Sequence, residues 1–262
     1  MLDLQNITKV FYPGTVNETH AINGITLHIN KGDVVSLIGS NGSGKSTLFN
    51  LISGTFPVTS GTITLDGKDI THQKEYKRAM DIGRVFQDPT KGTAANMSIE
   101  DNMITSSKKG MRYPKFSLYK KGVKEGFEEQ LKTIGLQGRL KDNVGLLSGG
   151  QRQALTLLMT VMSSPKLLLL DEHTAALDPP ASDNIMLMTE EIIKERSLTA
   201  MMITHNMKAA IGFGNRLIMM DRGRVILDIE GDEKKHMTVE KLVELFRGRS
   251  NKEFSEDAAL LT

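Results

Sequence analysis

A glycine-rich loop between an apolar run and a helical pattern constrains this chain more than any other stretch. Residues 34–38 (VVSLI) are typical of a buried strand, and residues 48–52 (LFNLI) have the apolar spacing of a helix. The loop between them fits G-x-x-x-x-G-K-[ST] in full. Glycines let successive backbone N–H groups converge on phosphate oxygens, and the helix adds its positive N-terminus. We therefore predict a phosphate-binding loop made of Gly39, Ser40, Asn41, Gly42, Ser43, Gly44, Lys45, Ser46 and Thr47.

A second apolar run ends in two carboxylates. Residues 167–170 are four leucines, and Asp171 and Glu172 follow them. In a nucleotide-hydrolysing enzyme with such a loop, Lys45 reaches the β- and γ-phosphates, while Ser46 and Asp171 hold Mg²⁺. Glu172 is then placed to orient and deprotonate the attacking water. The alternative is a buried strand that simply ends in solvated acids. The upstream loop favours the catalytic interpretation, so the two motifs together predict a P-loop nucleoside triphosphatase.

A third motif lies between these two in the sequence. Residues 147–153 read LSGGQRQ, and Ser148 is a good N-cap for an apolar helix predicted over residues 150–163. The stretch resembles the signature of ABC-type ATPases. In that family the signature of one subunit caps the γ-phosphate held by the loop of the other, so two ATP molecules are sandwiched in a head-to-tail homodimer. The resemblance assigns this contact to Ser148, Gly149, Gly150 and Gln151.

Other residues take their roles from the same resemblance, which covers roughly residues 2–230. Gln87 resembles the glutamine that senses Mg²⁺ and the attacking water, and Asp178 ends a segment that crosses the dimer interface. His205 resembles the switch histidine that contacts the γ-phosphate. Phe11 stands where an aromatic residue stacks on adenine, with Tyr12 as the alternative and a core role open for both.

His173 departs from the family pattern, because the family usually has proline at this position. Asp171, Glu172 and His173 are adjacent, which raises the question of a metal site. Consecutive residues of an extended chain point in different directions, and no further Cys or His lies nearby in sequence. Metal binding and direct catalysis by His173 are therefore disfavoured. We expect it to tune the connection from Glu172 to Asp178 through a hydrogen bond or by packing.

The resemblance and the alternation of apolar residues together predict an α/β fold. The expected architecture is a P-loop ATPase with a mixed RecA-like sheet core, an N-terminal antiparallel β subdomain and an inserted α-helical subdomain. Residues 1–250 form the domain, with the core over about 1–88 and 161–230 and the helical subdomain over about 89–160. Strands are expected over 2–8, 25–29, 34–38, 167–170 and 200–204. Hairpins are expected over 62–70, with Asp66-Gly67 as the turn, and over 216–228. Helices are expected over roughly 180–196 and 239–247, followed by a frayed tail over 251–262.

The composition limits which classes of binding partner we expect for this chain. The net charge is +2, from 33 basic and 31 acidic residues, so the bulk charge does not favour nucleic acid. The chain has no cysteine, no signal peptide pattern and no apolar run near the ~18 residues of a membrane span. A transport role therefore needs separate permease subunits, with this chain bound peripherally at the cytoplasmic face of the membrane. We expect ATP and Mg²⁺ as cofactors.

The kind of transport follows only from the resemblance. The stretches FYPGTVNETHAI, QDPTKGTAANMSIEDN and EHTAALD are similar to bacterial importer ATPases of the tryptophan/tyrosine type. Such importers also use an extracytoplasmic solute-binding protein, which would touch this chain only indirectly. Two alternatives remain open: an ATPase subunit for an exporter or a lipoprotein-type permease, and a soluble ABC ATPase without a membrane partner.

Overall fold

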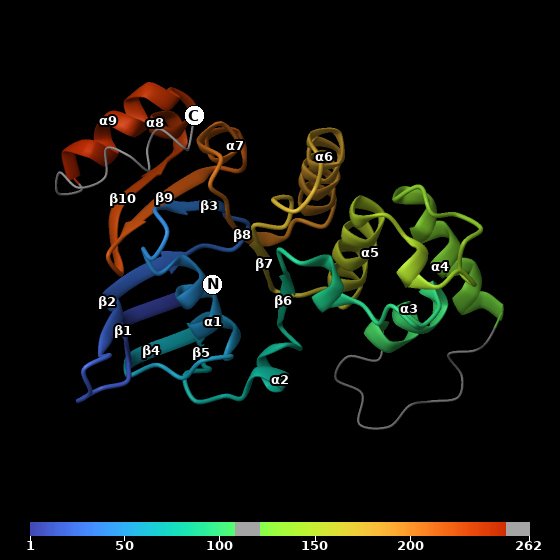
Figure 1. Cartoon of the computed structure of the whole chain (residues 1–262), viewed down its shortest axis with the longest axis horizontal. Coiled ribbons are helices and arrows are strands. Elements are labelled where there is room, and N and C mark those ends of the chain that lie inside the picture. The colour runs from blue at the N-terminus through green and yellow to red at the C-terminus, as the bar shows by residue number, and fades with distance from the viewer. Residues whose placement is uncertain (108–120, 250–262) are drawn as a thin grey trace. The chain divides into compact units, whose positions relative to one another are not determined.

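The structure of this chain is a computed structural model that describes residues 1–107 and 121–249. The chain divides into two units, Met1–Arg78 with Leu198–Thr262 and Ala79–Ser197. Figure 1 labels the helices and strands along the chain. The helical lobe that was expected over 89–160 falls inside the second unit. The tail predicted over 251–262 lies outside the described residues.

An antiparallel sheet opens the first unit. Strand β1 (Leu2–Phe11) pairs with β2 (Thr19–Ile29) on one side and β4 (Ser60–Leu65) on the other, and β4 continues into β5 (Lys68–Asp69). The β4–β5 hairpin turns at Asp66 and Gly67, both with positive φ, which is the Asp-Gly turn that the sequence predicts.

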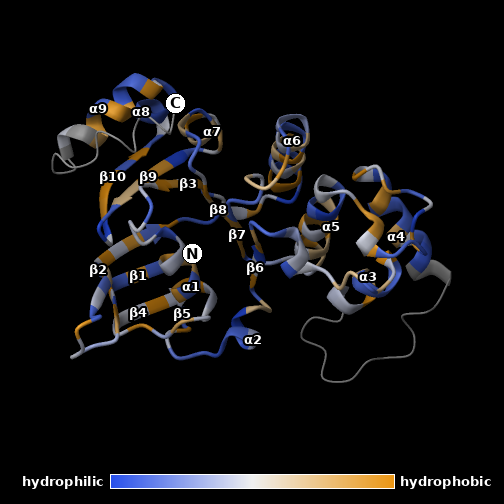
Figure 2. Cartoon of the chain, in the orientation of Figure 1, coloured by the Kyte–Doolittle hydropathy of each residue, from blue (hydrophilic) through white to orange (hydrophobic). Residues whose placement is uncertain are grey.

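The other strands of this unit surround β3 (Val34–Gly39). It pairs in parallel with β8 (Thr199–Ile203) and β9 (Arg216–Asp221), and β10 (Arg224–Glu230) lies antiparallel to β9. β8 and β9 are buried along their full length, as expected for strands with apolar runs. Figure 2 shows the hydropathy of each residue along the chain. The helices of the unit are α1 (Lys45–Ser53), α2 (Glu75–Arg78), α7 (Met207–Gly212), α8 (Gly231–Lys235) and α9 (Val239–Arg249).

The second unit has two parallel strands, β6 (Ile82–Val85) and β7 (Leu167–Asp171), with helices around them. Its core combines apolar residues of several helices, among them Met103, Leu131, Leu155 and Ile185. The helical elements are η1 (Pro89–Gly92), α3 (Ile99–Ser107), α4 (Lys121–Thr133), η3 (Val144–Leu146), α5 (Gly149–Met162) and α6 (Pro179–Glu195). Across the ranges 1–107 and 121–249, no helix combines the length and apolar character needed to cross a membrane.

Candidate functional site

The glycine-rich loop leaves β3 with a backbone that requires glycine at two points. Gly39 has φ +151°, and a Cβ there would lie 2.2 Å from the carbonyl oxygen of Met220 on strand β9. Gly44 caps the start of α1 with φ +102°, and a Cβ there would lie 2.7 Å from the carbonyl oxygen of Ala21. Real Cβ atoms do not approach backbone this closely, so any side chain would displace the loop.

Polar groups of this loop suit a phosphate. Lys45 is 5% exposed, and its Nζ donates hydrogen bonds to the carbonyl oxygens of Gly39 at 2.8 Å and Ser40 at 2.9 Å. Ser43 Oγ is buried and has no hydrogen-bond partner within the part of the chain that the structure describes. An ammonium and an unsatisfied hydroxyl in a glycine cradle complement anionic oxygens. The loop therefore fits the phosphates of a nucleotide.

The turn between β9 and β10 braces the same loop. The Gly223 amide donates to the carbonyl oxygen of Ser43 at 2.9 Å. Asn23 holds the turn in place, because its Nδ2 donates to the carbonyl oxygen of Arg222 at 2.8 Å and its amide donates to that of Gly223 at 2.9 Å. The β9–β10 turn and Asn23 thus hold the glycine-rich loop in place.

His205 follows strand β8 and is partly exposed. The amide of its neighbour Thr204 donates to the carbonyl oxygen of Leu37, which ties this segment to β3. His205 and Gly39 line the same small pocket, and Phe246 of α9 contributes to its wall. The first unit therefore brings the predicted switch histidine to the start of the phosphate loop.

Phe11 lies at the end of β1 in the same unit. Its ring makes an edge contact with Phe56, with ring centroids 5.4 Å apart, and Lys9 Nζ lies 5.0 Å from the Phe11 ring centroid. Tyr12 is 68% exposed and has a positive φ of 51°. Phe11 is thus held in a fixed orientation by neighbours, whereas the Tyr12 ring projects into solvent.

In the second unit, β7 ends at Asp171, whose carboxylate is paired with an arginine. Arg84 Nη2 on the neighbouring strand β6 donates to Asp171 Oδ2 at 2.6 Å, and both side chains are at most 15% exposed. The Arg84 guanidinium also lies 4.8 Å from the Phe86 ring centroid. Sequence reasoning missed Arg84, although a charged residue in the four-residue strand IGRV was a signal for a specific partner.

Glu172 follows with a left-handed backbone, φ +48°, which is uncommon for a residue with a side chain. Its carbonyl oxygen accepts from the amide of Ala175 at 3.0 Å, so the chain turns immediately after the strand. The next side chain, His173, is 1% exposed, and burial lowers its pKa to about 4. It is therefore neutral at physiological pH.

Gln87 is exposed and lies just after β6. The carbonyl oxygen of its neighbour Phe86 accepts a hydrogen bond of 3.1 Å from Nε2 of Gln153, which is fully buried on α5. Gln153 is a second residue that sequence reasoning missed. It is part of the quoted stretch LSGGQRQ, but its contact with the Gln87 segment depends on tertiary structure.

The signature stretch begins helix α5 with a capping box. Ser148 Oγ accepts from the amide of Gln151 at 3.3 Å, and Gln151 Oε1 accepts from the amide of Ser148 at 3.1 Å. A Cβ at Gly149 would lie 3.4 Å from Leu177, so the helix start packs beside the segment that leads to Asp178. Asp178 is exposed and makes no side-chain cap for α6. Ser148 and Gly149 are exposed, and the positive N-terminus of this helix suits an anion.

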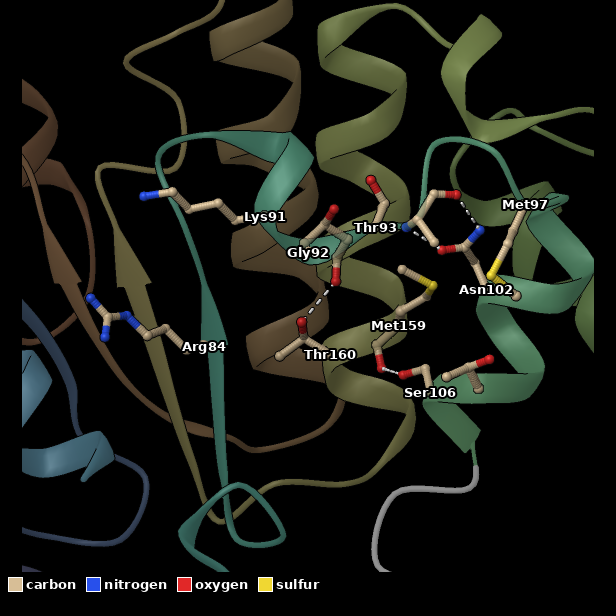
Figure 3. Close-up of a pocket in the computed structure, with 12 residues that line it drawn as sticks. Arg84, Lys91, Gly92, Thr93, Met97, Asn102, Ser106, Met159 and Thr160 are labelled. Atoms are coloured by element: carbon tan, nitrogen blue, oxygen red, sulfur yellow. Dashed lines mark hydrogen bonds between the residues drawn. The ribbon is translucent and has the colours of Figure 1, made fainter. Parts of the chain in front are cut away.

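The second unit also contains a groove of about 470 Å³ (Figure 3). Met97, Met159 and Thr105 line it, and Lys91 and Arg84 add positive charge. Hydrogen bonds shape its walls: the Asn102 side chain bonds both backbone groups of Ala94, and Ser106 Oγ donates to the carbonyl oxygen of Met159 at 2.7 Å. The groove is thus a built feature with mixed apolar and polar walls.

The predicted site residues fall into two groups. The first unit holds Phe11, the phosphate loop and His205, whereas the second holds Gln87, the signature, Asp171, Glu172 and Asp178. The proposed metal ligands Ser46, Gln87 and Asp171 offer a hydroxyl, an amide oxygen and a carboxylate. Oxygen donors of this kind suit Mg²⁺, so the residues present fit that ion.

Known proteins that are similar to this chain identify its family. The family model described as ABC transporter matches residues 22–175, more than half of the chain. The tyrosine transport ATP-binding protein of Clostridioides difficile (strain R20291) is 44% identical over 249 residues, which cover 94% of this chain and 98% of that protein. The methionine import ATP-binding protein MetN 1 of Bacillus thuringiensis subsp. konkukian (strain 97-27) is 32% identical over 229 residues, and these are 86% of this chain but only 65% of that protein.

A solved structure supports the fold. The dimeric ATP-binding cassette MJ0796, in a post-hydrolysis state bound to ADP and phosphate, superposes with a TM-score of 0.75 at 27% identity, over 88% of this chain and 98% of that one. The fold, the phosphate loop, the capped signature helix and these matches lead to one conclusion. The chain belongs to the ABC transporter family, as an ATP-binding subunit that hydrolyses ATP.

Proposed function

We propose that this chain powers the uptake of an amino-acid-like solute through the ATP-driven closing and opening of a head-to-tail homodimer. One observation carries the proposal: the chain has one phosphate loop and one capped signature helix, two anion-binding surfaces of different construction. Two copies facing in opposite directions complete two sites, each with the loop of one copy and the signature of the other. The dimeric state of the MJ0796 cassette supports this arrangement.

The residues divide the work as follows. Lys45 and the loop amides bind the phosphates, while Ser148, Gly149 and Gly150 of the other copy cap the γ-phosphate. Glu172 acts as general base for the attacking water, and Gln87 and His205 orient the water and the γ-phosphate. Ser46, Gln87 and Asp171 would hold Mg²⁺, which would supply positive charge against the phosphates.

The Glu172→Gln variant tests this division. Loss of a general base costs ~10²–10⁴-fold in rate, so ATP turnover should fall by at least a hundredfold while ATP binding persists. The variant should then elute as a dimer in saturating MgATP. The matched control is Glu190→Gln, an exposed glutamate of α6 in the same unit. Turnover at the parental rate, or a monomer with bound MgATP, would refute the assignment.

The groove of the second unit is the surface that we assign to the permease, specifically to a cytoplasmic helix of it. Met97 and Met159 offer an apolar contact, and Lys91 offers a positive charge at the edge. Met97→Asp should abolish co-purification with the permease and leave the ATP turnover of the isolated subunit unchanged. Met80→Asp, at an exposed methionine outside the groove, is the control. Retained co-purification of Met97→Asp would move the docking surface elsewhere.

The relatives favour import of an amino acid, because one is named for tyrosine transport and another for methionine import. Such a system includes an extracytoplasmic solute-binding protein that touches this chain only through the permease, and places the chain peripherally at the cytoplasmic face of the membrane. A gene for a solute-binding protein beside this one distinguishes import from export. Failure to co-purify with any membrane protein would instead favour a soluble ABC ATPase.

A further inference from the structure

His173 lies in the turn between β7 and α6, and its side chain contacts α6. Its side chain is buried, and Nε2 lies 3.0 Å from Thr189 Oγ1 on α6. Thr189 is fully buried and shares the inner face of α6 with Ile185 and Ile193. The contact therefore joins the residue after Glu172 to the middle of a 17-residue helix.

The direction of this hydrogen bond follows from the partners of Thr189. The Thr189 hydroxyl donates to the carbonyl oxygen of Ile185 at 2.7 Å. This bond uses the only hydrogen that the hydroxyl has to donate. Thr189 Oγ1 must therefore accept from His173, and His173 carries its proton on Nε2. The result is a continuous chain of hydrogen bonds from the His173 ring through the hydroxyl to the helix backbone.

The position of this anchor in the sequence gives it a role beyond packing. The residue before it, Glu172, has the left-handed backbone φ of +48°, a conformation that persists only when its surroundings hold it. On the C-terminal side, the bond from the Ala175 amide to the Glu172 carbonyl closes the turn. The His173 ring fixes the same turn to α6, so the backbone that carries the Glu172 side chain is held at both of these points.

We propose that His173 is a positioning residue for ATP hydrolysis, whose hydrogen bond to Thr189 holds the Glu172 carboxylate in its working direction. The proposal rests on the assignment of Glu172 as general base. It also explains how this chain manages with histidine where the family usually has proline: a hydrogen bond to α6 replaces the rigidity that a proline ring gives the backbone.

Thr189→Val tests the bond directly, because valine keeps the shape of threonine and removes the acceptor. We expect kcat for ATP hydrolysis to fall about tenfold with KM for ATP unchanged, since misplacement of a catalytic group costs rate rather than binding. Thr189→Ser keeps the hydroxyl and should retain kcat. His173→Leu should match Thr189→Val, and His173→Gln, whose amide N–H reaches a similar position, should recover most of the rate.

A stability control separates positioning from a loss of packing. Ile193→Val truncates a buried neighbour on the same face of α6 and leaves the His173–Thr189 bond intact. It should lower the melting temperature without lowering kcat. The double variant His173→Leu/Thr189→Val should lose no more rate than either single variant, because both remove the same bond.

Two outcomes overturn the proposal. If Thr189→Val keeps the parental kcat while Glu172→Gln loses turnover, the general base stands and His173 does not position it. If Glu172→Gln itself turns over at the parental rate, the general-base assignment fails and the positioning role fails with it. ATP binding and MgATP-dependent dimer formation, measured on the same variants, report on the proposed function independently of both.

Discussion

Arg84 Nη2 lies 2.6 Å from Asp171 Oδ2, and this ion pair joins the short strand β6 to the end of β7. Asp171 is followed directly by Glu172, so two carboxylates lie at one strand end. A largely buried carboxylate needs a partner to offset its desolvation, and Arg84 supplies it with a nearly buried guanidinium. The cation on β6 therefore holds the carboxylate of the proposed Mg²⁺ ligand in place.

Replacing Arg84 with leucine should destabilise the metal-free protein. Asp171 would lose this partner, and the expected decrease in the free energy of unfolding is about 1–3 kcal/mol. Arg84→Lys keeps the charge but not the planar fork, so its effect should be smaller. Urea denaturation without Mg²⁺ measures both variants. The control is Lys166→Leu, which breaks an exposed ion pair with Asp81 and should lower the free energy of unfolding by under about 1 kcal/mol. An equal decrease in Arg84→Leu would show that the buried pair contributes no more than a surface pair.

Two glycines of the phosphate loop should respond differently to substitution by alanine. Gly39→Ala would place a Cβ 2.2 Å from the carbonyl oxygen of Met220, so the loop and β9 must separate. Gly42 also has a positive φ, but a Cβ there meets nothing within 4 Å. Gly42→Ala should therefore cost only the backbone penalty, about 1–2 kcal/mol, and Gly39→Ala clearly more. Chemical denaturation of the nucleotide-free variants compares them, and equal losses would contradict the close approach to β9.

The stability of the protein should fall in acid because of His173. Burial lowers its pKa from an ordinary value near 6.5 to about 4, so the native state stays unprotonated where the unfolded chain takes up a proton. Between these two values the unfolded state binds more protons, and stability is lost as the pH falls. Each pH unit in this window is worth ~1.4 kcal/mol, or about 2 kcal/mol between pH 6.5 and pH 5.

A comparison of the parent with His173→Gln isolates this effect. The glutamine has no titration in this window, so its free energy of unfolding should decrease less between pH 7 and pH 5 than that of the parent. Urea denaturation at the two pH values gives the difference directly. Parallel losses in parent and variant would show that other groups cause the acid sensitivity.

The elements that sequence reasoning identified are those in which local pattern decides the structure. The phosphate loop, the leucine strand before Asp171 and the Asp66-Gly67 hairpin have residue types that the local backbone itself demands. The helix predicted to begin at Gly150 begins at Gly149 because Ser148 caps it. Strand β6 was missed because Ile82–Val85 contains only two large apolar residues, beside a glycine and an arginine.

The contacts that position the predicted residues were harder to foresee, because they join distant segments. Arg84 and Asp171 are 87 positions apart, and Gln153 and Phe86 are 67 apart. A hydrogen bond or packing was expected for His173. The sequence could not identify Thr189 as its partner, because that contact depends on how α6 packs against the turn. Motifs thus predicted the candidate site residues, and tertiary structure was needed to see which other residues hold these candidates in position.

Gln153 on helix α5 ties the signature stretch to the segment that carries Gln87. Its Nε2 donates to the carbonyl oxygen of Phe86, while its Oε1 is buried and has no hydrogen-bond partner among the described residues. Gln153→Met removes the hydrogen bond and also an unsatisfied buried oxygen, so the free energy of unfolding should change by less than about 1 kcal/mol. ATP turnover should nevertheless fall about tenfold, because the hydrogen bond that holds Phe86, the residue before Gln87, is lost. Thr160→Val is the control and should leave turnover unchanged, because Thr160 Oγ1 donates within α5 to the carbonyl oxygen of Thr156 and has no other hydrogen bond among the described residues. Parental turnover in a stably folded Gln153→Met would show that Gln87 is positioned without this contact.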